Sequence, residues 1–236
     1  MKGVTHATSG LAAGAIISTA MNLTPSIAFP TMLITAGAAM LPDFDHPQAS
    51  PARMYGKATE MLAAGISKLA GGHRKGTHTF YFPLLMGVLV FAAIVWVPAN
   101  VGTYAVAFLL MSLAFTGLRM IPAQYRWAFP VVCGGATWWL VSSGFVGVKA
   151  SLFVAGLVVV GAYTHILGDM LTESGVPLLG PIPVFGEPWR RVSFIPGFLQ
   201  HRGWFLSSGW WDMTFRVVCM VIIGVCALFY TGTIVL

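Results

Sequence analysis

The sequence predicts an all-α, multi-pass membrane protein: a bundle of about seven hydrophobic helices forming a single domain over residues 1–236. Hydrophobic residues make up 57% of the 236 residues and charged residues only 8%, whereas roughly a quarter of an ordinary soluble domain is charged. Several apolar runs approach the ~20 residues that a helix needs to cross the hydrocarbon core. No charge-rich or Ser/Gly-rich linker divides the chain.

Seven apolar segments account for the predicted helices. They fall near residues 9–22, 27–41, 80–97, 103–121, 127–143, 148–168 and 213–235. The first two are short, nearer to a re-entrant or buried hairpin than to full spans, and the turn-like sequence Asn22-Leu23-Thr24-Pro25 joins them. Whether they cross fully or dip and return, a helical hairpin leaves both of its ends on one side of the membrane.

A different kind of helix is predicted over residues 51–70. The apolar residues Met54, Ala58, Met61, Leu62 and Ile66 recur there at helical spacing, with charged residues between them. This pattern favours an amphipathic helix lying in the membrane interface. A solvated connector helix fits the same pattern equally well.

The positive charges are distributed unequally over the two sides of the membrane. Counting crossings from the N-terminal hairpin places segments 47–79 and 171–211 on the same side. Of the 13 Lys and Arg residues, only Lys149 falls on the other side. The positive-inside rule therefore predicts an inner-membrane protein with the charged side in the cytoplasm. The count depends on segments 103–121 and 127–143 both crossing.

The histidines and most of the acids fall on this same side. They comprise His6, then Asp43, Asp45 and His46 in LPDFDHP, His73 and His78 in GGHRKGTHTF, His165 and Asp169 in THILGDMLT, and His201. The predicted loops on the opposite side, 98–102 and 144–148, contain neither histidine nor acid. Loops hold polar residues in any case, but this explains only part of such a one-sided distribution.

These residue types at these spacings predict a metal site. His165 and Asp169 are four residues apart, hence on one side of a helix and ~6 Å apart along its axis. Asp43 and His46 share a face if the helical turn persists. Ionisable groups at membrane depth are normally paired, bound to an ion or facing water. Imidazole and carboxylate are ligands for zinc, manganese or iron, and several carboxylates suit two or three ions, as in phosphoester hydrolysis.

Single residues carry less weight than the group. A histidine at a helix end is more often an interfacial or capping residue, which is the simpler interpretation of His201. Asp43 alone could equally cap a loop. Core packing, however, does not explain why histidines and carboxylates from four separate parts of the chain share one side, so a metal site is the favoured interpretation.

Four motifs, taken in order, resemble the YdjM-like family of inner-membrane proteins, which are described as metal-dependent hydrolases. They are Thr5-His6, LPDFDHP from Leu41, HRKGTHT from His73 and HILGDMLTESGV from His165. The resemblance covers the chain from His6 to about Pro181, so the motifs lie within residues 6–181. The chain departs from the family pattern at Lys75, where glycine usually follows His-Arg.

The resemblance also implies a ligand set. The family is distantly similar to zinc-dependent phospholipases C and P1-type nucleases, which are all-helical enzymes with a three-zinc cluster. By that likeness the metal ligands are His6, Asp45, His78, His165 and Asp169, with Asp43, His46 and His73 as further ligands or their partners. The expected cofactor is therefore a divalent metal, zinc above others, in one to three ions.

The function expected from these observations is hydrolysis of a phosphoester in a lipid or lipid-linked substrate at the cytoplasmic membrane face. Asp43 or Asp45 would orient or deprotonate the attacking water. Phosphate oxygens would be held by Arg74, Lys75, Arg190 and Arg191. The expected partners are the bilayer and a phospholipid or lipid-linked molecule, and no nucleic acid.

Two other classes of protein remain open. One is a divalent-metal transporter or channel, and the other is a structural membrane protein with a stabilising metal. Transporters tend to bind their substrate near the bilayer midplane, on broken helices. The apolar middles of the predicted helices contain no acid or histidine, which favours an enzyme over a transporter.

Overall fold

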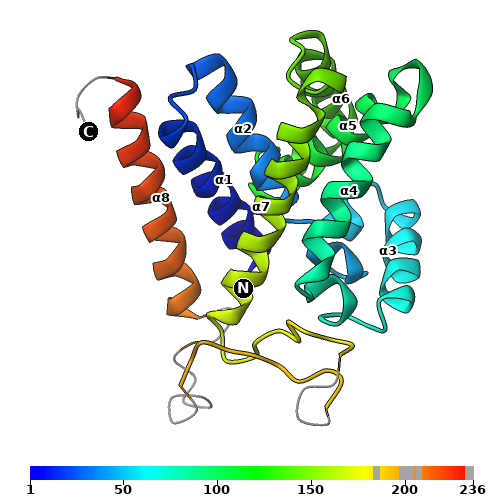
Figure 1. Cartoon of the computed structure of the whole chain (residues 1–236), viewed down its shortest axis with the longest axis vertical. Helices are drawn as coiled ribbons and strands as arrows, with labels where there is room; N and C mark the ends of the chain where they lie inside the picture. The colour runs from blue at the N-terminus through cyan, green and yellow to red at the C-terminus, as the bar shows by residue number, and fades with distance from the viewer. Residues whose placement is uncertain (183–186, 197–204, 206–208, 232–236) are drawn as a thin grey trace.

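The computed structural model describes residues 1–182, 187–196, 205 and 209–231, and within these residues it is helical and forms no strand. Eight α-helices run in chain order (Figure 1): α1 (Gly3–Ala20), α2 (Pro25–Ala38), α3 (Lys57–Leu69), α4 (Tyr81–Trp96), α5 (Val101–Gly117), α6 (Phe129–Ser142), α7 (Ser151–Met170) and α8 (Trp210–Tyr230). Three short 3-10 helices matter for the site: η1 (Pro42–Asp45), η2 (Pro51–Arg53) and η3 (Gly76–His78).

The prediction of an all-α membrane protein is confirmed, but the number of crossings is only partly supported. All helices except α3 coincide with the seven predicted apolar segments. Four stretches in the described residues are long and apolar enough to cross a membrane: Pro25–Asp45, Pro98–Gly117, Val148–Met170 and Trp210–Tyr230. Helix α4 is apolar but has only 16 residues, and α1 and α6 are not among the four.

The centre of the bundle is built from α1, α2, α5 and α7. Helix α2 packs against the other three, α4 packs against α5 and α7, α6 against α5, and α8 against α1. Glycines allow the closest of these contacts. A Cβ atom at Gly37 would collide with the Leu110 carbonyl of α5, and one at Gly161 of α7 with the Thr35 carbonyl of α2. Close approach through small residues is typical of membrane helix packing, in which backbone proximity takes the place of a hydrophobic driving force.

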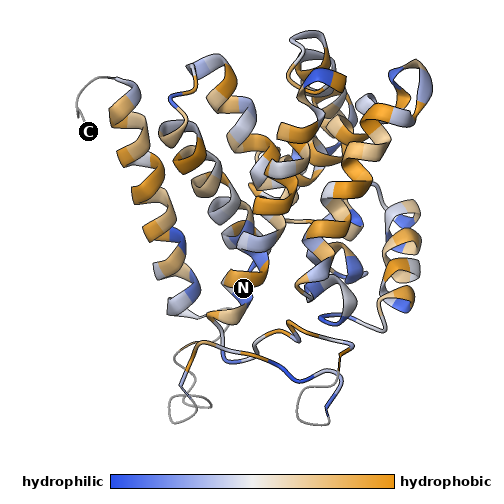
Figure 2. Ribbon diagram, viewed as in Figure 1, coloured by the Kyte–Doolittle hydropathy of each residue, from blue (hydrophilic) through white to orange (hydrophobic). Residues whose placement is uncertain are grey.

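The two ends of the bundle differ in polarity. The start of α1, the turns after α2, the end of α7 and the start of α8 lie toward the lower end in Figure 1, and the C-terminus lies at the opposite end. Figure 2 shows apolar colours along most of the bundle, with much of the hydrophilic colouring in the lower half. The described parts of segments 47–79 and 171–211 thus lie mainly in the lower half of this view, and their location on one side of the membrane stays a prediction.

The helix predicted over residues 51–70 is present as α3, which begins later, at Lys57. It packs against η1 and η2. Its outward side exposes the apolar residues Met61, Leu62 and Leu69, and Lys57 and Lys68 are exposed as well. By contrast, Ile66 on the other side of the helix packs partly against the core, as does Met54, which precedes the helix. An interfacial location for α3 stays a prediction.

The segment after α7 folds back over the end of the bundle. The Phe80 N–H donates to the Leu178 carbonyl at 2.8 Å, and the Phe194 N–H donates to the Met170 carbonyl at 2.8 Å. The indole Nε1 of Trp211 donates to the Leu171 carbonyl at 2.9 Å. These bonds fix the ends of α4, α7 and α8 relative to one another, close to the histidines and carboxylates.

Candidate metal centre

The predicted site residues meet where α1, α7, η1 and η3 come together. Contacts join α1 to α7, α7 to η1, and η1 to η3. His6 lies near the start of α1, Asp43 and Asp45 lie in η1 just after α2, His78 ends η3, and His165 and Asp169 lie near the end of α7. Four separated parts of the sequence therefore deliver histidine or carboxylate to one place.

Four side-chain atoms converge at this place: His78 Nε2, His165 Nε2, Asp43 Oδ1 and Asp169 Oδ2. The two imidazole nitrogens are 3.3 Å apart. Asp43 Oδ1 lies 3.9 Å from His78 Nε2 and 3.7 Å from His165 Nε2. Asp169 Oδ2 lies 3.7 Å and 3.9 Å from the same two nitrogens. Ligand atoms bound tetrahedrally to one zinc ion are about 3.4 Å apart, and each carboxylate oxygen lies 3.7–3.9 Å from both nitrogens. We term these four atoms the cage; ligand atoms of His78, His165 and Asp169 lie within 4.8 Å of one another.

Hydrogen bonds on the far side of both imidazoles determine where their protons lie. His165 Nδ1 is 2.7 Å from the Ala39 carbonyl oxygen, which only accepts, so Nδ1 carries the proton. The Thr77 hydroxyl donates to Asp45 and therefore accepts from His78 Nδ1, 3.0 Å away. In the neutral imidazoles both Nε2 atoms then present lone pairs to the cage. The two Nε2 lone pairs and the two carboxylate oxygens are all acceptors, an arrangement that suits a cation. Outer hydrogen bonds of this kind orient metal-binding histidines.

Burial keeps His78 in the neutral form. Loss of solvation and, to a smaller extent, the nearby His165 lower the pKa of His78 to about 3, although the carboxylates of Asp43 and Asp169 act in the opposite direction. Neutral imidazole is the form that binds metal ions. His78 therefore needs no deprotonation at physiological pH before it can act as a ligand.

His6 places a third imidazole beside the cage. Its ring stacks on His165 with centroids 3.7 Å apart, and its Nε2 lies 3.3 Å from Asp169 Oδ1. One ligand atom each from His6, Asp43 and His165 lie within 4.8 Å of one another. Among the described residues, both His6 ring nitrogens are buried without a hydrogen bond of good geometry. Orphaned buried atoms of this kind fit a bound cation.

Asp45 is engaged by the loop before α4 instead of the cage. Its Oδ1 accepts a hydrogen bond from His73 Nδ1 at 2.7 Å. Its Oδ2 accepts from the Thr77 hydroxyl and from the Arg74 backbone N–H. The nearest histidine atom of the cage is His78 Nδ1, 3.9 Å away on the far side of that ring. Both carboxylate oxygens of Asp45 therefore accept hydrogen bonds from this loop. These bonds position His73 directly and His78 through Thr77.

A polar hollow of about 370 Å³ opens beside the cage. It is lined by the start of α1, the η1–η2 loop and the loop before η3, including Asp43, His46, His73 and Arg74. His46 Nδ1 accepts the Gln48 N–H at 3.1 Å, which uses one of its two possible ligand atoms. Asp43 is the one residue of the cage with an appreciable exposed fraction, 16%, so the hollow reaches the cage on the Asp43 side.

Cationic groups pair with the carboxylate of Asp169. Arg74 Nη2 lies 3.0 Å from Asp169 Oδ2, and the N-terminal ammonium of Met1 lies 2.6 Å from Asp169 Oδ1. These positive groups offset the buried negative charge of Asp169.

The other basic residues predicted to hold phosphate lie elsewhere. Lys75 Nζ lies over the ring of Trp189, 5.5 Å from its centroid, and Arg190 and Arg191 are exposed. Among the four predicted residues, all of which the structure describes, Arg74 alone lines the polar hollow. His201 lies outside the described residues.

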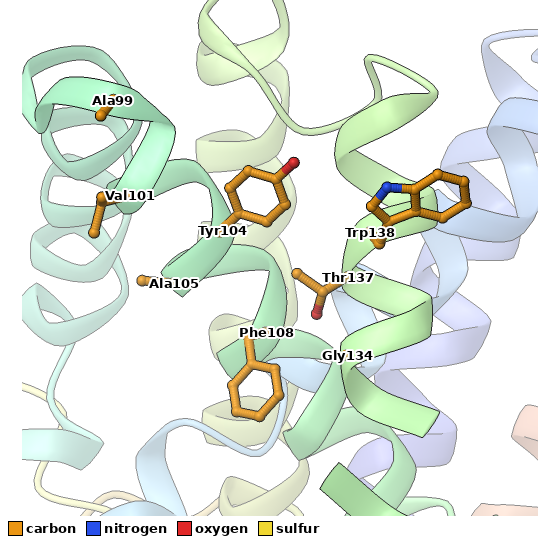
Figure 3. A pocket seen from close by; sticks show the side chains of 8 residues that line it. All are labelled: Ala99, Val101, Tyr104, Ala105, Phe108, Gly134, Thr137 and Trp138. Carbon is orange, nitrogen blue, oxygen red and sulfur yellow. The ribbon is translucent and has the colours of Figure 1, made fainter. Parts of the chain in front are cut away.

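A larger hollow, of about 510 Å³, lies between α5 and α6. Figure 3 shows its lining: Ala99, Val101, Tyr104, Ala105, Phe108, Gly134, Thr137 and Trp138. No histidine or carboxylate is among these residues. The size of a hollow therefore does not locate the candidate site in this protein.

Two contributors to the centre were not assigned a role from the sequence. Thr77 connects Asp45 to His78, and its position immediately before a histidine was a usable signal. The Ala39 carbonyl orients His165. A backbone carbonyl leaves no signal in the sequence, because its role depends on how α2 crosses α7.

Comparison with known families agrees with the motif resemblance. The family model described as YdjM inner membrane protein matches residues 1–235. No curated protein and no solved structure matches the chain significantly. The match extends over nearly the whole sequence, so the chain belongs to the YdjM inner membrane protein family.

Proposed function

We propose that this member of the YdjM inner membrane protein family is a metal-dependent hydrolase that cleaves a phosphoester. The convergence of His78 Nε2, His165 Nε2, Asp43 Oδ1 and Asp169 Oδ2 carries the proposal. Two imidazoles and two carboxylates are a donor set that suits zinc. His6, whose ligand atom lies within 4.8 Å of those of Asp43 and His165, adds a third imidazole to this donor set.

A divalent ion held in the cage would polarise a phosphoryl oxygen and lower the pKa of a coordinated water. The surrounding residues complete the chemistry. Asp43 would bind the ion on the side of the cage that opens to the polar hollow, through which the substrate would enter. The Nδ1–H group of His73 donates a hydrogen bond to Asp45. The Nε2 lone pair is then available as a general base for a water in the hollow. Asp45 orients His73 and stabilises the imidazolium that forms, as the acid of an Asp–His pair does.

The substrate we propose is a phospholipid or a lipid-linked phosphoester, approached from the membrane interface. Helix α3 contacts η1, which carries Asp43 and Asp45. Its exposed Met61, Leu62 and Leu69, with the exposed Lys57 and Lys68, suit the boundary between acyl chains and anionic headgroups. The cytoplasmic side follows from the positive charges, of which only Lys149 falls on the other side.

Hydrolysis by the purified full-length chain tests the proposal. Zinc-loaded protein in lipid nanodiscs should release phosphate or a phosphorylated headgroup from at least one member of a panel of phosphoester lipids. Asp43→Asn and Asp45→Asn should each lower that rate by roughly 10²-fold or more, because the former removes a ligand and the latter the partner of the base. Glu60→Gln is the matched control, since Glu60 lies on the outer helix α3 and forms a surface ion pair with Arg53.

Two results would contradict the proposal. If Asp43→Asn hydrolyses the substrate as fast as the wild type at equal expression, the cage does not take part in the reaction. Absence of any phosphoester cleavage by the wild type, together with zinc uptake into proteoliposomes that requires Asp43, would favour the transporter.

Reporter fusions test the orientation separately. A reporter at the C-terminus should be found outside the cytoplasm, and one inserted after Ile182 should be found inside. If both reporters lie on the same side, the count of crossings is wrong.

A further inference from the structure

Arg74 reaches into the buried cluster from an unusual backbone position. Its φ angle is +58°, in the left-handed region that non-glycine residues rarely adopt. Its backbone N–H donates to Asp45 Oδ2 at 3.3 Å, which holds the residue in this conformation. The side chain, only 16% exposed, then spans from the loop before η3 to the end of α7, with Nη2 3.0 Å from Asp169 Oδ2.

The oxygen that Arg74 contacts is one of the four converging atoms of the cage. Asp169 Oδ2 also lies 3.7 Å from His78 Nε2 and 3.9 Å from His165 Nε2. The other oxygen, Oδ1, faces the Met1 ammonium and His6. A divalent ion in the cage would therefore meet the guanidinium at a shared oxygen, where two positive charges a few ångströms apart repel strongly because water is excluded.

We propose that Arg74 is an exchangeable counter-ion of this centre, an inference that rests on the proposed metal site. In the metal-free protein its guanidinium neutralises Asp169. When a divalent cation takes Asp169 Oδ2, the guanidinium turns into the adjacent polar hollow, which Arg74 already lines together with Asp43, His46 and His73. There the planar guanidinium donates two parallel hydrogen bonds to the phosphate group of the substrate.

This exchange links two binding events. A phosphate that draws Arg74 away from Asp169 removes a competitor of the metal, and a bound metal frees Arg74 for phosphate. Linkage requires the two effects to be equal in free energy. Metal binding and anion binding should thus strengthen each other. Arg74 should account for the part of this coupling that does not come from direct contact between the ion and the anion.

The test measures zinc affinity of the full-length protein in nanodiscs by competition with a chelator, with and without inorganic phosphate. Arg74→Gln should bind zinc on the order of tenfold more tightly than the wild type without phosphate, because the competing charge is gone. Phosphate should tighten zinc binding to the wild type severalfold, and this gain should be largely lost in Arg74→Gln. Lys149→Gln is the matched control: it removes an exposed charge just before the start of α7, whereas Asp169 lies at the end of that helix, and it should leave both quantities unchanged.

Thermal unfolding provides a second readout. Without metal, Arg74→Gln should unfold at a lower temperature than the wild type, because the buried Asp169 loses a partner, and zinc should remove most of the difference. Arg74→Lys keeps a charge and is the fallback if Arg74→Gln does not fold. It should fall between the wild type and Arg74→Gln in zinc affinity.

The outcomes separate the two proposals. Wild-type protein that holds zinc, with Arg74→Gln or Arg74→Lys holding it no more tightly, would overturn the exchange alone and leave the metal centre intact. Wild-type protein that holds no divalent ion at all would overturn both.

Discussion

The polar hollow at the candidate metal centre and the hollow between α5 and α6 differ in size and in chemistry, and the smaller one has the features of a site. The α5–α6 hollow measures about 510 Å³ and the polar one about 370 Å³. Figure 3 shows the former lined by apolar and aromatic side chains, with hydroxyls on Tyr104 and Thr137. In a membrane protein such a hollow faces acyl chains as readily as a ligand. Convergent ligand atoms, and not volume, separate the two regions.

Loss of a ligand should give the largest difference between the two regions. His165→Ala removes one of the four converging atoms, so the zinc content of the purified protein should fall by roughly tenfold or more. Leu167→Ala, on the exposed side of the same helix, is the matched control and should keep its metal. The measurement is elemental analysis after dialysis against a weak chelator. If His165→Ala and the wild type contain equal amounts of zinc, His165 is not a ligand of the metal centre.

A smaller effect is expected from Thr77, which touches the ligands without belonging to the cage. Thr77→Val keeps the side-chain shape and removes the hydroxyl that connects Asp45 to His78 Nδ1. Zinc affinity should fall by about tenfold, the lower end of what loss of a partner of a metal-binding histidine causes, and the zinc content after the same dialysis should fall less than in His165→Ala. The Thr79 hydroxyl donates to the Gly76 carbonyl of its own loop at 2.9 Å, so Thr79→Val is the control and should weaken zinc binding much less.

The metal-free centre should also make stability depend on pH. The pKa of His78 is lowered from 6.5 to about 3 by burial, so between these values the unfolded chain takes up a proton that the folded chain does not. The free energy of unfolding should therefore fall as the pH drops below about 6.5, by at most about 1.4 kcal/mol per pH unit from this group.

Denaturant unfolding of metal-free protein at pH 7.5, 6.0 and 5.0 measures this dependence. His78→Gln should show a shallower loss of stability over that range than the wild type. Identical pH dependence in the two proteins would mean that His78 is not held neutral by the fold.

The α5–α6 hollow should give the smallest effect. The Thr137 hydroxyl donates to the Cys133 carbonyl of its own helix at 2.7 Å, and Trp138 is exposed. Thr137→Val and Trp138→Leu should therefore leave zinc content within about twofold of the wild type. A loss of zinc comparable with that of His165→Ala would show that the two regions are not independent.

The distribution of residue types predicted which parts of the chain meet, but not the roles within them. Apolar segments located the helices, and the one-sided placement of histidines and carboxylates indicated the end at which His6, Asp43, His78, His165 and Asp169 lie together. These are strong signals because an unpaired ionisable group at membrane depth is costly.

The choice between Asp43 and Asp45 could not be made from spacing. Two residues apart in a 3-10 turn, their carboxylates point to different partners: Asp43 toward the cage, and Asp45 toward His73 and Thr77. Which direction each takes depends on the loop before α4, 30 residues later in the chain and shaped by left-handed backbone conformations at Gly71, Gly72 and Arg74. Local sequence pattern does not encode that distant loop geometry.

X-ray absorption at the zinc edge of the loaded protein tests the metal centre most directly. The four converging atoms predict two imidazole nitrogens and at least two oxygens at ~2.0–2.1 Å, with the outer-shell scattering of two imidazole rings. His165→Ala should lose about half of the imidazole scattering, and Glu60→Gln should reproduce the wild-type spectrum. A zinc environment without imidazole scattering, or one unchanged by His165→Ala, would contradict a metal centre built on His78 and His165.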